Sequence, residues 1–283
     1  SCTMSDESNS ARRGGRAARR ASRTNAAKHA PPVKNIVRQL PLTELCSEEG
    51  LEIIEANAET VLQEIGIDFK GDEEILKLWR DAGADVDGER VRFPKGLVRS
   101  LLKTAPEIYV QHARNPLRNV TFGGNNVIFA PVYGPPFVHD LDAGRRYGKM
   151  VDFENFVRLA YMAPDLHHSG GTVCEPVDIP INKRHLDMVY AHMKLSDKPF
   201  MGAVTATERA ADTLEMCNIL FGPSFVTEHT VCTSLINVNS PLAFDEVMLG
   251  ALKTYSRAGQ AVIVLSLIHI SEPTRRTPIS YAV

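Results

Sequence analysis

The sequence predicts an α/β fold, a partial (β/α)8 (TIM) barrel with about five of the eight strands and an N-terminal helical extension. Apolar, β-branched runs recur between residues 126 and 264, and segments with helical spacing separate them. Near-continuous apolar strands that alternate with amphipathic helices are typical of a parallel sheet covered by helices, in a barrel or a doubly wound sheet. The runs are Val127–Val132, Leu166–Cys174, Pro199–Val204, Val231–Val238 and Ala261–Val264.

The spacing of the runs fits a barrel in size. Four strand–helix units and a fifth strand occupy roughly 140 residues, the pace of a barrel of about 250 residues. Closing the ring would need three more units. We therefore expect an unclosed sheet whose exposed edge promotes aggregation, and a chain that is inactive by itself.

The sequence after Val264 lacks the expected next helix. It reads LSLIHISEPTRRTPISYAV, with two prolines and paired arginines. Its first part, LSLIHISEPTR, resembles the translation of a transposon-type sequencing adapter. We therefore expect residues 265–283 to be a non-native tail, and the codons of the encoding DNA distinguish this from a divergent native tail.

Residues 1–35 form a basic segment with few hydrophobic side chains, so we expect a disordered tail. A targeting peptide is an alternative. Nucleic-acid binding is disfavoured because no aromatic side chains interleave the arginines. The basic residues are Arg12, Arg13, Arg16, Arg19, Arg20, Arg23, Lys28 and Lys34.

Composition narrows the class of protein. The net charge is -2, and no apolar stretch approaches the roughly 20 residues that span a bilayer, so no membrane association is expected. The 5 cysteines show no repeated spacing, which argues against a disulfide framework or a CxxC metal site. A cytoplasmic location is the simplest expectation.

Residues 36–125 are predicted to form the helical extension. Ser47 is a suitable N-cap for a helix that ends near Gly66 and has one apolar stripe, which we expect to be buried. A second helix is expected over Glu73–Ala82, followed by a short strand at Arg90–Phe93 and a helix at Leu97–Leu102.

Residues 126–264 are predicted to form the truncated barrel. We expect Asp152 to cap a helix over Phe153–Met162 and Thr207 to cap the next one but one. Ser240 is the expected cap of the last helix, with Pro241 at its first position.

Polar and aromatic residues follow the predicted strands, where α/β folds place their chemistry. Glu175 comes directly after an apolar run, and a carboxylate there can attract a cation or exchange a proton. Tyr133 and Phe137 can face an ammonium group with their rings. Each residue taken singly also fits packing or turn formation. The full candidate set is Glu175, Tyr133, Phe137, Thr205, Asn237 and Asn239.

Several other mechanisms lack their motifs. GxSxG, GxGxxG and a phosphate loop ending in GK[ST] are absent from the sequence. His185 and His192 are seven residues apart, which is not the spacing of a helical metal chelate. No metal site is therefore predicted, and no catalytic residue is assigned.

The run from Leu42 to Val264 resembles the trimethylamine methyltransferase (MttB-like) family of corrinoid-dependent methyltransferases. The phrases that carry the resemblance are RRGGRAARR, VCEPVDIP, SDKPFMG and INVNSPLAFDEVMLGALKTYSRAGQAVIV. The resemblance implies a (β/α)8 barrel. It also implies methyl transfer from a methylated amine, or a quaternary amine such as glycine betaine, to cobalt.

The resemblance places the corrinoid (cobalamin) on a separate cognate corrinoid protein, so this chain alone is expected to bind no cofactor. Reduced cobalt attacks the methyl carbon, and the enzyme's task is mainly positioning. We expect Glu175 to hold the cationic substrate, Tyr133 and Phe137 to line the pocket, and Asn237 and Asn239 to orient polar groups. The pyrrolysine of the true trimethylamine enzymes would fall beyond Val264.

Two alternatives stay open. One is an unrelated barrel lyase or hydrolase, which an assay of methyl transfer to reduced corrinoid distinguishes. The other is a non-catalytic fragment that binds polyanions through its basic tail, in which case binding by residues 1–40 alone falls steeply with salt.

Overall fold

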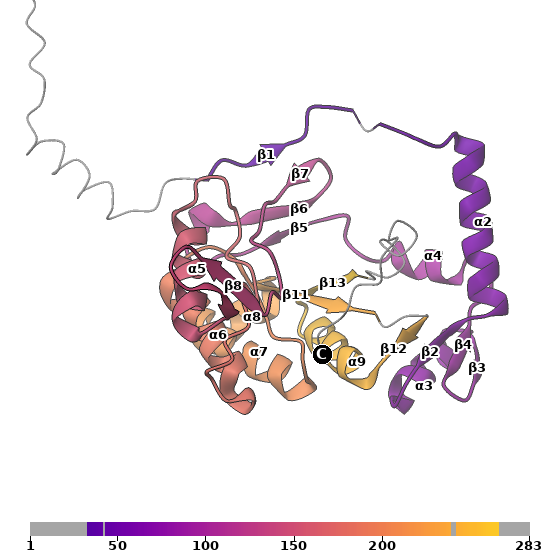
Figure 1. Cartoon of the computed structure of the whole chain (residues 1–283). Coiled ribbons are helices and arrows are strands. Elements are labelled where there is room, and N and C mark those ends of the chain that lie inside the picture. Colours follow the sequence, from indigo (N-terminus) through magenta and orange to yellow (C-terminus); the bar gives the residue numbers. More distant parts are fainter. Residues whose placement is uncertain (1–32, 42, 239–241, 266–283) are drawn as a thin grey trace, which may run out of the picture.

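The computed structural model describes residues 33–41, 43–238 and 242–265. At its centre lies a three-stranded parallel sheet in the order β10-β11-β13 (Figure 1). The strands are β10 (Phe200–Met201), β11 (Cys232–Asn237) and β13 (Ala261–Leu265). Their register pairs Phe200 with Cys232 and Thr233 with Ala261. The α/β class is confirmed, and none of the described sheets closes into a barrel.

Helices alternate with these strands along the chain. The helices from α6 to α9 pack with the sheet in the largest core cluster, which includes the fully buried Tyr255, Ile236 and Val231, whereas α5 packs in a separate cluster around Phe153. Close approach of α7 and α9 requires Gly250, because a Cβ there would lie 1.9 Å from Thr207 Oγ1. The helices are α5 (Met150–Met162), α6 (Ile181–Leu195), α7 (Thr207–Phe221), α8 (Pro223–Glu228) and α9 (Glu246–Arg257).

The first two predicted strands are not regular strands. In the run Val127–Val132, only Val127 belongs to a strand, and Leu166–Cys174 contains none. Prolines cannot donate to a ladder, and Pro131 interrupts the first run. Gly170, with φ +85°, bends the second.

These two segments nevertheless lie beside the sheet. The Phe129 carbonyl accepts from the His167 amide at 2.9 Å. Ser169 N donates to Pro199 O, and Met201 N donates to Gly170 O, both at 2.8 Å. The backbone therefore follows the order 127–134, 167–173, β10, β11, β13, each neighbour being next along the chain.

Three predicted helix starts are wrong. Helix α5 begins at Met150, and Asp152 lies in its first turn, where its carboxylate accepts from Lys149 N at 2.9 Å. The residue before α7 is Ala206, so Thr207 is its first helical residue. Helix α9 begins at Glu246 with Asp245 as N-cap, because a short strand precedes it. Ser240 and Pro241 lie outside the described residues.

The N-terminal elements follow the prediction closely. Ser47 caps the first helix by accepting from Gly50 N at 3.2 Å. The predicted second helix, short strand and third helix are present. Helices and strands here are β1 (Ile36–Val37), α2 (Glu48–Glu64), β2 (Ile67–Phe69), α3 (Glu73–Asp81), β3 (Asp85–Asp87), β4 (Arg90–Arg92) and α4 (Leu97–Leu102).

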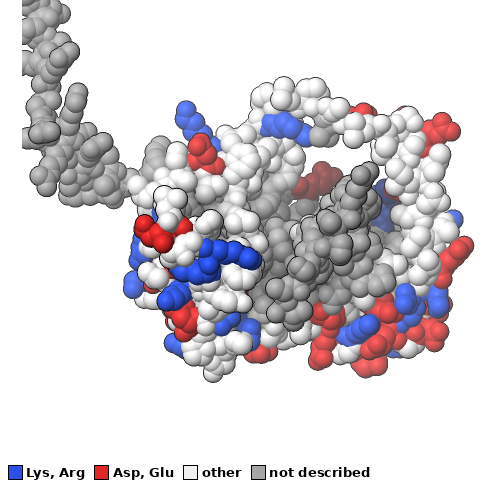
Figure 2. Space-filling model, viewed as in Figure 1, with Lys and Arg blue, Asp and Glu red and all other residues white. Residues whose placement is uncertain are grey.

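A four-stranded sheet joins the N-terminal elements to the segment before α9. Its order is β12-β2-β4-β3, and β12 (Ala243–Phe244) pairs in parallel with β2. Phe69 stacks on Phe244 at 5.3 Å between ring centroids, and Leu249 of α9 is buried in the same cluster. Helix α2 has no buried residue, so the expected burial of its apolar stripe is wrong, and its visible side is mostly uncharged in Figure 2.

Three antiparallel pairs complete the fold. These are β1 with β7, β5 with β6, and β8 with β9. Strand β5 reaches the sheet, because Gln111 bridges to Thr230 and its side-chain amide donates to Phe200 O at 2.9 Å. The elements are β5 (Ile108–Gln111), the 3-10 helix η1 (Pro116–Arg118), β6 (Val120–Gly123), β7 (Asn126–Val127), β8 (Phe137–Asp140) and β9 (Gly144–Tyr147).

A buried lysine fixes the end of α5. Lys198 Nζ donates to the carbonyls of Ala160, Ala163 and Leu166 at 2.7, 3.0 and 2.7 Å. Ala160 lies in the last turn of α5, where carbonyls have no partner within the helix, and the other two carbonyls lie in the segment that follows. Burial lowers the pKa of Lys198 to about 8.

Within the described residues, no helix is long and apolar enough to cross a membrane. The expected basic tail falls almost wholly on residues 1–32, outside the described ranges. The same holds for the expected non-native tail, apart from Leu265, which belongs to β13.

Candidate functional site

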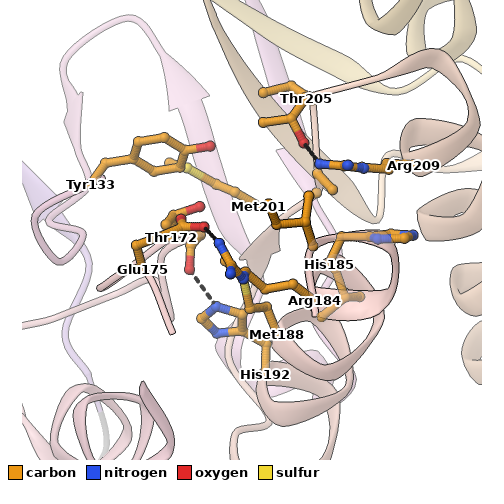
Figure 3. Close-up of a pocket in the computed structure, with 16 residues that line it drawn as sticks. Tyr133, Thr172, Glu175, Arg184, His185, Met188, His192, Met201, Thr205 and Arg209 are labelled. Carbon is orange, nitrogen blue, oxygen red and sulfur yellow. Dashed lines mark hydrogen bonds and ion pairs between the residues drawn. The ribbon is translucent and has the colours of Figure 1, made fainter. Parts of the chain in front are cut away.

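A cavity with an empty volume of about 580 Å³ lies at the carboxyl end of β10. Four parts of the chain form it: the segment that carries Tyr133, residues 171–175, helix α6, and the segment from β10 into α7 (Figure 3). Carboxyl ends of parallel strands are the usual place for chemistry in α/β folds.

Tyr133 forms one side of the cavity and packs against Gly171. A Cβ at position 171 would lie 2.6 Å from Tyr133 Cε2 and 2.9 Å from Met201 Cβ, so only glycine leaves room for the ring. Burial raises the pKa of Tyr133. The phenol therefore stays neutral and offers an aromatic surface with its hydroxyl.

Glu175 and Arg184 form an ion pair in the cavity. Arg184 Nη1 donates to Glu175 Oε1 at 2.5 Å, and the two side chains are 16% and 37% exposed, respectively. Arg184 also donates from Nε and Nη2 to the Ile179 carbonyl, at 3.1 and 2.9 Å. The guanidinium is thus fixed in one orientation by three hydrogen bonds.

Arg209 and Thr205 lie on another side of the cavity. Arg209 Nη1 donates to Thr205 Oγ1 at 2.7 Å (Figure 3). Among the described residues, no carboxylate forms an ion pair with Arg209. This guanidinium therefore keeps most of its five N–H donors available to a ligand.

Two buried histidines support the segment beneath Tyr133. His192 Nε2 donates to the Gly171 carbonyl at 2.7 Å, and its Nδ1 accepts from Ser169 Oγ at 2.7 Å. His168 Nδ1 accepts from Gly170 N at 2.9 Å. Burial lowers the pKa of His192 to about 4 and that of His168 to about 3. Both rings are neutral near pH 7, and their hydrogen bonds hold the backbone of residues 169–171 in place.

His185 also lines the cavity. Its ring points away from Tyr133 toward α7 in Figure 3, where Nε2 lies 2.7 Å from Asp212 Oδ2. This contact joins α6 to α7 and so helps fix the spacing of two cavity walls.

The backbone of the segment from β10 into α7 is also held by hydrogen bonds from two side chains. Tyr255 OH donates to the Ala203 carbonyl at 2.7 Å, and Ala203 N donates to Thr213 Oγ1 at 3.3 Å. Gly202 lies against the same tyrosine, since a Cβ there would be 2.3 Å from its hydroxyl. The wall that carries Thr205 is thereby fixed by side chains of α7 and α9.

The structure brings three of the predicted site residues together. Tyr133, Glu175 and Thr205 all line the cavity. Phe137 does not: it lies on the β8–β9 hairpin, 4.7 Å from the Tyr147 ring and with Arg145 3.9 Å above it. Asn237 is exposed at the end of β11 and does not line the cavity. Asn239 lies outside the described residues.

Sequence reasoning missed the two arginines. Arg184 lies in the first turn of α6 and Arg209 in the first turn of α7. Each helix follows a predicted strand end, so extending the search from the strand ends into the next helical turn would have found both. Among the described residues, no three His, Cys, Asp or Glu side chains are grouped so as to hold a metal ion.

Comparisons with known proteins add independent evidence. A family model described as trimethylamine methyltransferase (MTTB) matches residues 12–280. A glycine betaine methyltransferase of Desulfitobacterium hafniense (strain Y51) is 46% identical over 230 residues, which are 81% of this chain and 48% of that protein. A proline betaine:corrinoid methyltransferase of Eubacterium limosum is 26% identical over 247 residues, 80% of this chain and 48% of that protein. The chain thus spans about half the length of the curated relatives it matches.

Proposed function

The chain belongs to the trimethylamine methyltransferase (MTTB) family, and we propose that it takes part in methyl transfer from a methylated or quaternary amine to a corrinoid protein. The cavity holds the methyl donor. In a protein of the relatives' length, the methyl group passes to the cobalt of a corrinoid on a separate cognate protein. The observation that carries the proposal is the 46% identity to a glycine betaine methyltransferase over a stretch that includes every described cavity residue.

The chemistry that the cobalt supplies is nucleophilic attack on the methyl carbon. The chain's own residues bind and orient the donor. Tyr133 presents a neutral aromatic ring, which attracts a quaternary ammonium through its negative face. Glu175 adds a carboxylate whose Oε1 is fixed by Arg184. The amine that departs from a quaternary donor is neutral, so bond cleavage needs no strong acid. Holding the donor in one orientation is the main contribution to rate.

The proposal also includes the barrel architecture of the protein. We infer that the row of neighbouring segments from residue 127 to β13 is an arc of a (β/α)8 barrel. Sequential order, parallel direction and a helix between successive segments support this. Among the described strands, β13 is paired along one edge only, and we expect the chain alone to self-associate and to be inactive in methyl transfer. A monomer at micromolar concentration in sedimentation velocity would contradict the first expectation.

A chimera tests the function. The segment of the D. hafniense enzyme that aligns with this chain is replaced by the matching residues of this chain. The chimera is mixed with glycine betaine and the reduced corrinoid protein, and methylation of the cobalt is followed by its visible absorption. We expect methylation with the chimera and its loss in the same chimera carrying Tyr133→Ala. A folded chimera that methylates cobalt with neither glycine betaine nor trimethylamine would contradict the proposal.

A cytoplasmic location remains part of this proposal, since a reduced corrinoid requires a reducing compartment. Three of the cysteines, Cys174, Cys217 and Cys232, are buried free thiols. Their burial agrees with packing rather than with disulfide formation.

A further inference from the structure

The cavity wall carries more positive than negative charge. Of the charged side chains that line it in the described structure, Glu175 is the one carboxylate, and Arg184 and Arg209 are the guanidiniums. His192 is buried and neutral, because burial lowers its pKa to about 4. Glu175 and Arg184 neutralise each other. One positive charge, that of Arg209, is left uncompensated in the wall.

Such a wall does not suit a donor that is only a cation. A bare trialkylammonium or tetraalkylammonium ion would enter a cavity with an excess of like charge. A donor that also carries a carboxylate removes this conflict, because its anionic end can meet Arg209 while its ammonium meets Tyr133. Figure 3 shows the Arg209 guanidinium held beside Thr205, across the cavity from Tyr133.

Helix stability does not explain Arg209. It lies in the first turn of α7, where the helix dipole disfavours a positive side chain. Its hydrogen bond to the exposed Thr205 hydroxyl orients the guanidinium but leaves its charge unpaired. A planar guanidinium with free N–H donors is the group that binds a carboxylate with two parallel hydrogen bonds.

We propose that Arg209, oriented by Thr205, is the carboxylate subsite of the cavity and makes the protein select methyl donors that are amino-acid betaines over donors without an acid group. The proposal rests on the proposed function, since it assigns one end of the same donor. Arg184 does not take this role, because Glu175 and the Ile179 carbonyl already occupy its donors.

Equilibrium binding to the full chain tests the assignment, with glycine betaine and tetramethylammonium chloride as calorimetric titrants. We expect glycine betaine to bind more tightly than tetramethylammonium. Arg209→Met should weaken glycine betaine binding by about tenfold or more, the usual loss for a hydrogen bond between charged groups. Tetramethylammonium binding should stay the same or become tighter. Arg209→Lys should restore part of the affinity, because it returns the charge without the planar fork.

The matched control is Arg158→Met. Arg158 is a half-exposed arginine on α5 that contacts a residue four positions earlier, as Arg209 contacts Thr205, but it lies outside the cavity. Its substitution should leave both affinities unchanged. Equal loss of glycine betaine affinity in Arg158→Met and Arg209→Met, or no loss in Arg209→Met, would overturn the subsite.

The outcomes separate this subsite from the proposed function. Binding of tetramethylammonium as tight as that of glycine betaine overturns the subsite and leaves an amine-binding cavity. Binding of neither ligand overturns both proposals.

Discussion

Two walls of the cavity each carry one arginine: the Glu175 wall, with Arg184, and the Thr205 wall, with Arg209. The two arginines differ in whether their charge is paired. Arg184 is paired with a carboxylate and a carbonyl through three donors. Within the described structure, the Arg209 guanidinium has one hydrogen bond, to the Thr205 hydroxyl. The charge of Arg184 is thus paired in the free protein, whereas the charge of Arg209 is available for a ligand to neutralise.

The supports of the two walls differ as well. Gly171, next to the Glu175 wall, is held by the buried neutral His192. Ala203, in the Thr205 wall, is held by Tyr255 and Thr213, neither of which titrates between pH 4 and 7. One wall is therefore held by a group that acid can protonate and carries no net charge, whereas the other is held by groups that acid does not protonate and carries one positive charge.

The largest expected effect comes from Gly171→Ala. The added methyl group would meet Tyr133 Cε2 at 2.6 Å and Met201 Cβ at 2.9 Å. We expect the free energy of unfolding to fall by about 2–3 kcal/mol, the upper part of the usual range for overpacking, because both contacts are with atoms close to the backbone or in a buried ring. Urea unfolding measures it. Gly50→Ala on α2 is the control, where the nearest atom is 3.4 Å away and no loss is expected. Equal stability of the two variants would show that Tyr133 does not pack on Gly171.

Acid should weaken the Glu175 side selectively. The folded pKa of His192 is about 4, below the unfolded value of about 6.5, so the unfolded chain binds the proton first as the pH falls. The stability due to neutral His192 is therefore full above pH 6.5 and is lost toward pH 4. Between pH 6.5 and 5 this amounts to about 2 kcal/mol.

Urea unfolding of the wild type and His192→Gln at several pH values isolates this contribution. We expect the stability difference between the two proteins to shrink by that amount between pH 6.5 and 5. Tyr255→Phe removes the corresponding hydroxyl of the other wall, and its difference from wild type should not vary with pH. A constant difference for His192→Gln would contradict a buried neutral imidazole.

Removing each arginine sharpens the contrast in charge. Arg184→Met leaves Glu175 without its partner in a half-buried place, and we expect a loss of about 1–2 kcal/mol. Arg209→Met breaks one exposed hydrogen bond and relieves an unfavourable helix-dipole contact, so stability should change by less than about 0.5 kcal/mol. Thermal unfolding of both variants decides this. A larger loss for Arg209→Met would mean that its role is structural.

The smallest expected effect is that of Thr205→Val. It removes the hydroxyl that orients Arg209 and should change the free energy of unfolding by less than about 0.5 kcal/mol. Glycine betaine affinity should still fall about threefold, less than in Arg209→Met, because the charge remains. An affinity equal to that of the wild type would show that Thr205 does not position the guanidinium.

The sequence predicted best those elements whose local signals are strong. Helix α2 begins after Ser47 because the serine side chain caps it, although its apolar stripe is not buried in the described structure. The last three parallel strands were found because they are apolar and uninterrupted. The first two runs could not be assigned correctly, since hydrophobicity does not show that Pro131 and Gly170 break the hydrogen-bond ladder.

The sequence predicted only some of the residues of the candidate site. The rule that polar residues at strand ends form sites found Tyr133, Glu175 and Thr205. It failed for Phe137, because the chain turns into the β8–β9 hairpin after Pro136. The rule also left out the first turn of the next helix, where the two arginines lie. It therefore predicted a pocket for a cation and did not predict the positive charges in its wall.

The most direct test of the central claim is a crystal structure of the chain with glycine betaine. We expect the trimethylammonium group against the Tyr133 ring and the carboxylate within hydrogen-bond distance of Arg209, with the Glu175–Arg184 pair intact. Glycine betaine bound outside this cavity, or inside it with the carboxylate toward Tyr133 and away from Arg209, would contradict the claim.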